Sequence, residues 1–127
     1  MALILVVEDD ETNQELVSRF LTRCGHKVFL AADGLTAVRI ALERIPDLIL
    51  MDLNLPGMDG WEAAGLIKSK PETASVPIIA LTAHNLFGDV KKALGAGIDA
   101  YETKPVVYQR LMKRIAELLN ENRKTGA

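Results

Sequence analysis

The sequence contains only one cysteine, Cys24, so no disulfide can form within the chain. The pattern of an export signal, a charged segment followed by an apolar one, is absent from the N-terminal residues. We therefore expect the protein to act in a reducing cytoplasm. Cys24 itself is interpreted as a small buried hydrophobic residue.

Charge of one sign and long apolar runs are also scarce. The 15 basic and 17 acidic side chains give a formal net charge of -2, which favours neither nucleic acid nor a membrane surface as a direct partner. The longest apolar runs, such as residues 2–7 and 48–51, are far shorter than the roughly 20 residues of a membrane-spanning helix. They are typical of buried strands instead.

What the sequence does have is the composition of one soluble domain: 127 residues, of which 49% are hydrophobic and 25% charged. Short apolar runs alternate with segments whose apolar residues recur at helical spacing. The predicted strands cover residues 2–7, 28–31, 48–51, 77–81 and 100–102. The predicted helices cover residues 12–24, 33–45 with Asp33 as the cap, 61–68, 86–96 and 107–119. This alternation predicts an α/β fold with a mainly parallel sheet and helices on both faces.

Polar side chains stand where four of the predicted strands end. Glu8 and Asp9 follow the first strand, Asp52 follows the third, and Thr82 and Lys104 follow the fourth and fifth. In an open α/β sheet the functional crevice lies beyond the carboxyl ends of the strands. We therefore expect these side chains to meet in space.

The acidic residues among them favour a divalent cation. Three carboxylates at one point repel each other unless a cation shares them, and hard oxygen ligands suit Mg²⁺, with Mn²⁺ as the alternative. Glu8, Asp9 and Asp52, a backbone carbonyl near Asn54 and water would form an octahedral shell. An aspartate carboxylate is also a known nucleophile toward phosphorus. Taken alone, Glu8, Asp9 and Asp10 are explained more simply as a solvated turn that caps a helix.

Four motifs resemble the receiver domain of two-component response regulators, and together they extend over nearly the whole chain. They are VVEDD at 6–10, LILMDLNLPGMDG at 48–60, IIALTAH at 78–84 and YETKP at 101–105. The separations of Asp52 from Thr82 and from Lys104 also match that family. The resemblance implies a flavodoxin-like, doubly wound sheet of five parallel strands in the order 2-1-3-4-5. It divides the chain into a receiver domain, residues 1–120, and a polar C-terminal tail, residues 121–127.

The resemblance also implies roles for single residues. They are Asp52 as phosphoacceptor, Glu8, Asp9, Asp52 and the backbone carbonyl of Asn54 as metal ligands, and Thr82 and Lys104 as phosphate contacts. Tyr101 would be the switch aromatic, and Lys104–Pro105 resembles the cis peptide bond of the family. In that family, the threonine and the aromatic ring move together and repack the face formed by the fourth helix, fifth strand and fifth helix.

The function implied by the resemblance is a phosphorylation switch and not an enzyme with turnover. Its chemistry would be limited to self-phosphorylation from phosphodonors and slow autodephosphorylation. A histidine kinase or histidine phosphotransfer protein would dock on the first helix near Asn13, Leu16 and Phe20, and a downstream protein would read the output. His84 would lie near the acceptor and either tune the lifetime of the phosphate or be a surface residue.

Two other functions stay open at this point. A small Mg²⁺-dependent phosphohydrolase with an aspartyl-phosphate intermediate would use the same residue types, although one such superfamily has an acid where this chain has Asn54. A constitutive adaptor with a vestigial site is the third hypothesis. The intact set of site residues argues against it.

Overall fold

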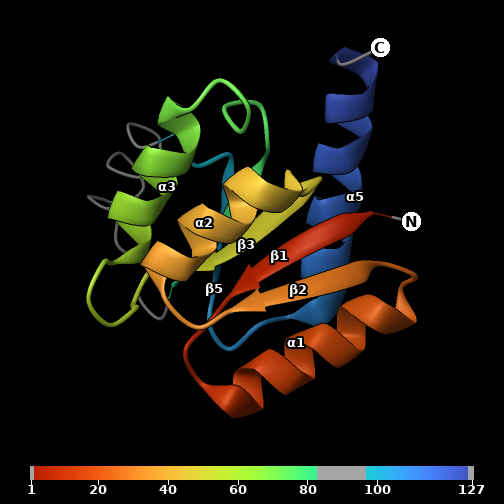
Figure 1. The fold of residues 1–127 in the computed structure, drawn as a ribbon. Coiled ribbons are helices and arrows are strands. Elements are labelled where there is room, and N and C mark those ends of the chain that lie inside the picture. Colours follow the sequence, from red (N-terminus) through yellow and green to blue (C-terminus); the bar gives the residue numbers. More distant parts are fainter. Residues whose placement is uncertain (1, 83–96, 126–127) are drawn as a thin grey trace.

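The computed structural model describes residues 2–82 and 97–125, with side chains as far as Asn120. The strands are β1 (Leu3–Val7), β2 (Lys27–Ala31), β3 (Leu48–Asp52), β4 (Ile78–Thr82) and β5 (Ala100–Thr103). The helices are α1 (Glu11–Arg23), α2 (Gly34–Arg44), α3 (Gly60–Ser69) and α5 (Tyr108–Thr125), as Figure 1 shows. His84 and the helix predicted over 86–96 lie outside the described residues.

The strands form one parallel sheet in the order β2-β1-β3-β4-β5, which confirms the expected fold and strand order. β1 pairs with two neighbours, so that Val7 stands opposite Ala31 of β2 and Met51 of β3. The chain first moves from β1 outward to β2 and then returns past β1 to β3. The direction of winding therefore reverses between β1 and β3, and a crevice is expected beyond the carboxyl ends of these two strands.

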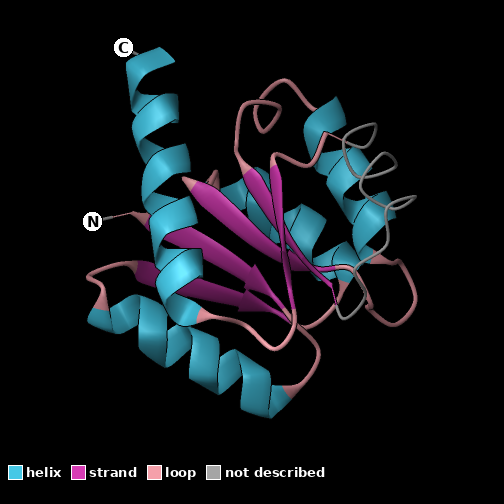
Figure 2. Cartoon of the chain, turned by 180° about the vertical axis from the view of Figure 1, so that it is seen from behind, coloured by secondary structure: helices cyan, strands magenta, loops and turns pink. Residues whose placement is uncertain are grey.

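Helices cover both faces of the sheet (Figures 1 and 2). α2 and α3 pack on one face, over a core that includes Leu5 and Ile49. α1 and α5 pack on the other face, over a core that includes Ile4 and Leu50. Successive strand residues point to opposite faces, which explains why adjacent residues of β1 and of β3 serve different cores and why these strands are apolar without interruption.

Three of the four described helices, α1, α2 and α3, have an aspartate as the N-cap residue. Asp10 accepts a hydrogen bond from the backbone N–H of Asn13 at 2.9 Å, and Asp33 accepts one from Thr36 at 2.7 Å. Asp59 caps α3 in the same way. An aspartate at this position satisfies an otherwise unpaired N–H of the first turn, so the prediction of Asp33 as a cap is confirmed.

Two predictions were wrong, one about the burial of Cys24 and one about the end of the last helix. Cys24 is exposed, because α1 ends at Arg23 and the chain turns away through Gly25, whose φ is 89°. α5 continues to Thr125, beyond the predicted end at residue 119, so most of the segment predicted as a polar tail is helical. Its last residues are polar and include the helix formers Glu121, Arg123 and Lys124, which a search for apolar periodicity does not detect.

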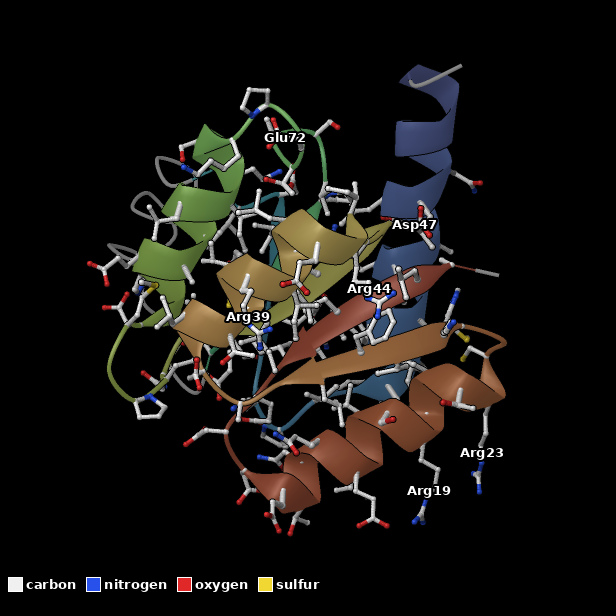
Figure 3. The ribbon with its side chains drawn as sticks, in the orientation of Figure 1. Arg19, Arg23, Arg39, Arg44, Asp47 and Glu72 are labelled. Atoms are coloured by element: carbon white, nitrogen blue, oxygen red, sulfur yellow. The ribbon has the colours of Figure 1, made fainter. Side chains whose placement is uncertain are left out.

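The outer faces of α1 and α2 carry charged side chains. Figure 3 shows Arg19 and Arg23 projecting from α1 away from the sheet. On α2, Arg39 Nη1 lies 3.7 Å from Glu43 Oε1, one helical turn farther along. None of the helices in the described part of the chain has the length and apolar character needed to cross a membrane.

Candidate functional site

The polar residues at the strand ends meet beyond the carboxyl edge of the sheet. Lys104, which follows β5, places Nζ 2.9 Å from Asp52 Oδ2 at the end of β3 and 3.5 Å from Glu8 Oε1 after β1. Glu8, Asp9 and Asp52 each offer a carboxylate oxygen, and these three atoms lie within 4.8 Å of one another. Residues far apart in the sequence therefore form one cluster.

Glu8 and Asp9 are positioned by the turn between β1 and α1. The Glu8 N–H donates to Ala31 O of β2 at 3.0 Å, which extends the pairing one residue past β1. The Asp9 N–H donates to Glu8 Oε2 at 3.0 Å, and the side-chain Nε2 of Gln14 donates to Glu8 O at 2.6 Å. The turn is thus held from the sheet side and from the helix side.

Asp52 is the last residue of β3 and is only 2% exposed. Its Oδ1 accepts a hydrogen bond from the backbone N–H of Asn54 at 2.9 Å, and its Oδ2 accepts one from Lys104 Nζ at 2.9 Å. Each oxygen of this buried carboxylate therefore has a donor. The two hydrogen bonds fix the orientation of the carboxylate, and the ammonium group of Lys104 neutralises part of its charge.

The start of α3 lies against the backbone of Asp52 and leaves no room for a side chain at Gly60. A Cβ there would lie 2.5 Å from Asp52 O and 2.7 Å from Leu53 Cα. The Gly60 N–H donates to Leu53 O at 3.3 Å. Trp61, the only tryptophan, follows directly and is half-buried.

The charges of the cluster change its proton affinities. Burial of the carboxyl and its neighbour Asp52 raise the pKa of Glu8 from 4.5 to about 7, although Lys104 opposes the change. Burial lowers the pKa of Lys104, but its contacts with Asp52 and Glu8 outweigh this effect and raise the pKa above its ordinary value. Lys104 is therefore a cation, and the site has more acid than this one cation balances.

The arrangement fits a magnesium ion. Three carboxylate oxygens converge, two of them on the buried residues Glu8 and Asp52, and the third on the exposed Asp9. Oxygen ligands with an open side for water are the environment that Mg²⁺ prefers. Asn54, the other residue expected to contribute, is exposed two positions after Asp52, and its N–H binds Asp52.

The remaining predicted residues lie along β4 and β5. The Lys104 N–H donates to Thr82 O at 2.7 Å, which joins the ends of the two strands. Tyr101 pairs with Ala80 in the sheet and is 39% exposed. The Lys104–Pro105 peptide bond is cis.

A groove of about 580 Å³ leads from the cluster between α1 and the start of α5. Its lining includes Glu8 and Lys104 at one end and Leu16, Val106 and Tyr108 along its length. Leu16 is 49% exposed. Phe20, which was expected to belong to a docking surface, packs against Tyr108 with ring centroids 4.7 Å apart.

The sequence did not predict four polar contacts. They are the bond from Gln14 to Glu8, the contact of Lys68 Nζ with Asp99 Oδ2 at 3.0 Å, and the buried Glu102, which lies 3.7 Å from both Arg110 and Arg114 of α5. Each joins separate elements, so no local pattern marks it. For Glu102, the acid in the middle of a strand was a signal that could have been followed.

Known proteins are similar to this chain over most of its length. Residues 4–116 match the family described as the response regulator receiver domain. The polar-differentiation response regulator DivK of Brucella anthropi is 34% identical over 118 residues, which cover 93% of this chain and 96% of that protein.

Solved structures show the same likeness. The receiver domain of a sensor histidine kinase from Pseudomonas aeruginosa PAO1, with a magnesium ion coordinated in its active site cleft, is 39% identical and superposes with a TM-score of 0.87. The match covers 94% of this chain and 98% of that one. The chemotaxis protein CheY4 of Vibrio cholerae is 28% identical with a TM-score of 0.89, over 93% of this chain and 98% of that one.

Proposed function

Because this chain belongs to the response regulator receiver domain family of two-component signalling, we propose that it is a phosphorylation switch whose acceptor is Asp52. Members of this family are signalling switches and not conventional enzymes. The observation that carries the proposal is the placement of Lys104 Nζ 2.9 Å from a buried aspartate that shares a cluster with two further acids.

In the proposed reaction, a carboxylate oxygen of Asp52 attacks the phosphorus of a phosphohistidine or of a small phosphodonor. A new bond forms between phosphorus and this oxygen, and the bond to the donor breaks, so that its electron pair leaves with the donor. Lys104, held beside Asp52, faces the developing negative charge on the phosphoryl oxygens. Thr82, at the end of β4, would donate its hydroxyl to the transferred group.

A divalent cation belongs to the same proposal. Glu8, Asp9, Asp52 and the backbone carbonyl of Asn54 would hold Mg²⁺, which supplies neutralisation of the charge on the incoming phosphoryl group. Glu8 binds a cation only after it loses its proton, so the raised pKa of Glu8 makes metal binding depend on pH near neutrality.

The output of the switch would be a change of surface around β5 and α5. Tyr101 and Thr82 belong to the adjacent strands β5 and β4, whose ends are joined by the bond from Lys104 N–H to Thr82 O. A shift of Thr82 toward the phosphoryl group would change what the partly exposed Tyr101 ring packs against. It would thereby favour a packing of this face that differs from that of the unphosphorylated protein. A downstream protein would bind one packing better than the other.

The groove beside α1 supports a docking site for the phosphodonor protein. It is lined by Asn13 and the exposed Leu16 and reaches Glu8 and Lys104 of the site. A histidine kinase or histidine phosphotransfer protein that lies in this groove would bring its phosphohistidine to Asp52. Phe20 packs against Tyr108, which lines the groove, and would help to hold this side chain in place.

The test is the loading of the protein with acetyl phosphate and Mg²⁺, followed by intact-mass spectrometry. We expect the wild type to gain one phosphoryl group and Asp52→Asn to gain none, because the amide is not a nucleophile toward phosphorus. Glu72→Gln is the control, since Glu72 is an exposed acid in the loop that leads into the amino end of β4, whereas the site lies at the carboxyl ends of the strands, and this variant should load normally.

Beryllium fluoride, which mimics the phosphoryl group, provides a second measurement. It should perturb the amide signals of Thr82 and Tyr101 in the wild type and not in Asp52→Asn. Equal loading of the wild type and Asp52→Asn, or phosphate on another residue, would refute the assignment of the acceptor.

A further inference from the structure

The side chain of Gln14 donates a hydrogen bond to the backbone outside its own helix. It is the fourth residue of α1, and its Nε2 donates to the backbone oxygen of Glu8, six residues earlier, at 2.6 Å. The first turn of α1 does not need this bond, because Asp10 already accepts from the N–H groups of Asn13 and of Gln14 itself. The side chain of Gln14 therefore acts on the turn before the helix.

The carbonyl oxygen that accepts the bond from Gln14 lies just beyond the last paired residue of β1. The register of β1 with β2 ends at Val7 and Ala31, and Glu8 adds one further bond through its N–H. Its C=O lies beyond the paired residues. A backbone carbonyl in a half-buried turn needs a donor, and the amide of Gln14 supplies it.

Repulsion between carboxylates acts on this turn. Glu8 and Asp9 lie on it, and their carboxylate oxygens are held within 4.8 Å of an oxygen of Asp52. Like charges at this distance push the turn away from β3, and Lys104 offsets only part of that repulsion. A bond from α1 to the backbone of Glu8 opposes the displacement without occupying a carboxylate oxygen that a cation would use.

We propose that Gln14 is a positioning residue for the metal site: by fixing the carbonyl of Glu8 to α1, it keeps the Glu8 and Asp9 carboxylates in place before the cation binds. The proposal rests on the proposed function, because the cation is the one expected there. Preorganised ligands bind more tightly, since less order has to be created on binding.

The test uses Gln14→Met, which keeps the length of the side chain and removes its donor. Gln109→Met, the same substitution at an exposed position of α5, is the control. Titration calorimetry with Mg²⁺ should give a roughly five-fold weaker affinity for Gln14→Met, the factor that corresponds to about 1 kcal/mol for one hydrogen bond, and no change for Gln109→Met.

A second readout needs no metal. In the metal-free protein, the carbonyl carbon of Glu8 should shift upfield in Gln14→Met, and the amides of Asp9 and Asp10 should exchange faster, while the melting temperature changes by only a few degrees. A purely structural role would lower the melting temperature and leave the Mg²⁺ affinity of the folded protein unchanged.

The outcomes separate this proposal from the proposed function. If the wild type binds Mg²⁺ and Gln14→Met binds it equally well, Gln14 does not position the site and the inference is overturned. If the wild type does not bind Mg²⁺, the proposed function fails. In that case, unchanged amide exchange at Asp9 and Asp10 in Gln14→Met overturns the inference as well. Faster amide exchange there supports the proposal that Gln14 fixes the turn.

Discussion

Glu8 binds its proton more tightly in the folded protein than a free glutamate does. Its side chain is buried beside Asp52, whereas Asp9 is exposed, and burial with this neighbour raises the pKa of Glu8 to about 7. Near neutral pH, the metal-free site therefore holds a proton for part of the time. That proton reduces the repulsion among the carboxylates in the way that a cation would.

This proton makes stability depend on pH in an unusual direction. The pKa of Glu8 is higher in the folded chain than its ordinary value of 4.5, so the folded state binds a proton that the unfolded state has lost. The stabilisation is complete below about pH 4.5 and is lost as the pH rises through 7. We expect metal-free wild type to lose stability relative to Glu8→Gln between about pH 4.5 and 7, the interval between the two pKa values.

Urea unfolding of both proteins in a chelating buffer at several pH values measures this difference. Glu8→Gln has no proton to lose at this position and keeps the shape of the side chain, so it serves as the reference. Asp33, whose pKa is lowered by its hydrogen bonds with Thr36, lies outside the cluster, so its effect is the same in both proteins and cancels. A wild-type curve parallel to that of Glu8→Gln would contradict the raised pKa.

The contact between α3 and the end of β3 decides how the backbone of Asp52 is held. Gly60 begins α3, and its missing side chain lets the helix approach the backbone of Asp52. Gly65, one turn and a half farther along the same helix, has no atom within 4 Å of a Cβ built there. The two glycines are chemically alike, but only the first is required by its neighbours.

We therefore expect opposite effects from two identical substitutions. Gly60→Ala should destabilise the fold by about 1 to 3 kcal/mol, because the methyl group would overlap with Asp52 O and Leu53 Cα. Gly65→Ala should stabilise it by about 0.5 to 1 kcal/mol, because alanine loses less conformational freedom in a helix. Chemical denaturation measures both, and a loss of stability in Gly65→Ala would show that packing around α3 is tighter than described.

The elements that the sequence predicted well are those with abrupt local signals. Apolar runs that stop at a charged residue located β1 and β3 with their carboxylates, and Asp33 marked the start of α2. The need for glycine at position 60 and the bond from Gln14 to Glu8 could not be predicted, since both depend on the distance between two elements after packing. The end of α1 was predicted to within one residue, but the exposure of Cys24 was missed, because residue type alone does not tell whether a cap position faces the core or the solvent.

The site exists only when the sheet is complete. Glu8 follows β1, Asp52 ends β3 and Lys104 follows β5, so the cluster requires strands from the first, middle and last parts of the chain. An unfolded chain does not bring these residues together. A ligand that binds the cluster therefore stabilises the folded state as a whole.

We expect Mg²⁺ to raise the melting temperature of the wild type. At a free concentration about one hundred times its dissociation constant, a ligand that binds only the folded state adds about 2.7 kcal/mol, roughly 10 °C for a domain of this size. The measurement is differential scanning calorimetry, with NaCl of equal ionic strength as the control for screening. An equal rise in a variant that combines Asp9→Asn with Asp52→Asn would indicate that the ion acts elsewhere.

The position of Trp61 gives the molecule a built-in optical reporter. As the sole indole, it follows the glycine that touches the backbone of Asp52, and it is half-buried at the start of α3. Any change in its emission can be attributed to this one junction without an attached dye. Events at Asp52 can therefore be followed in real time in the unlabelled protein.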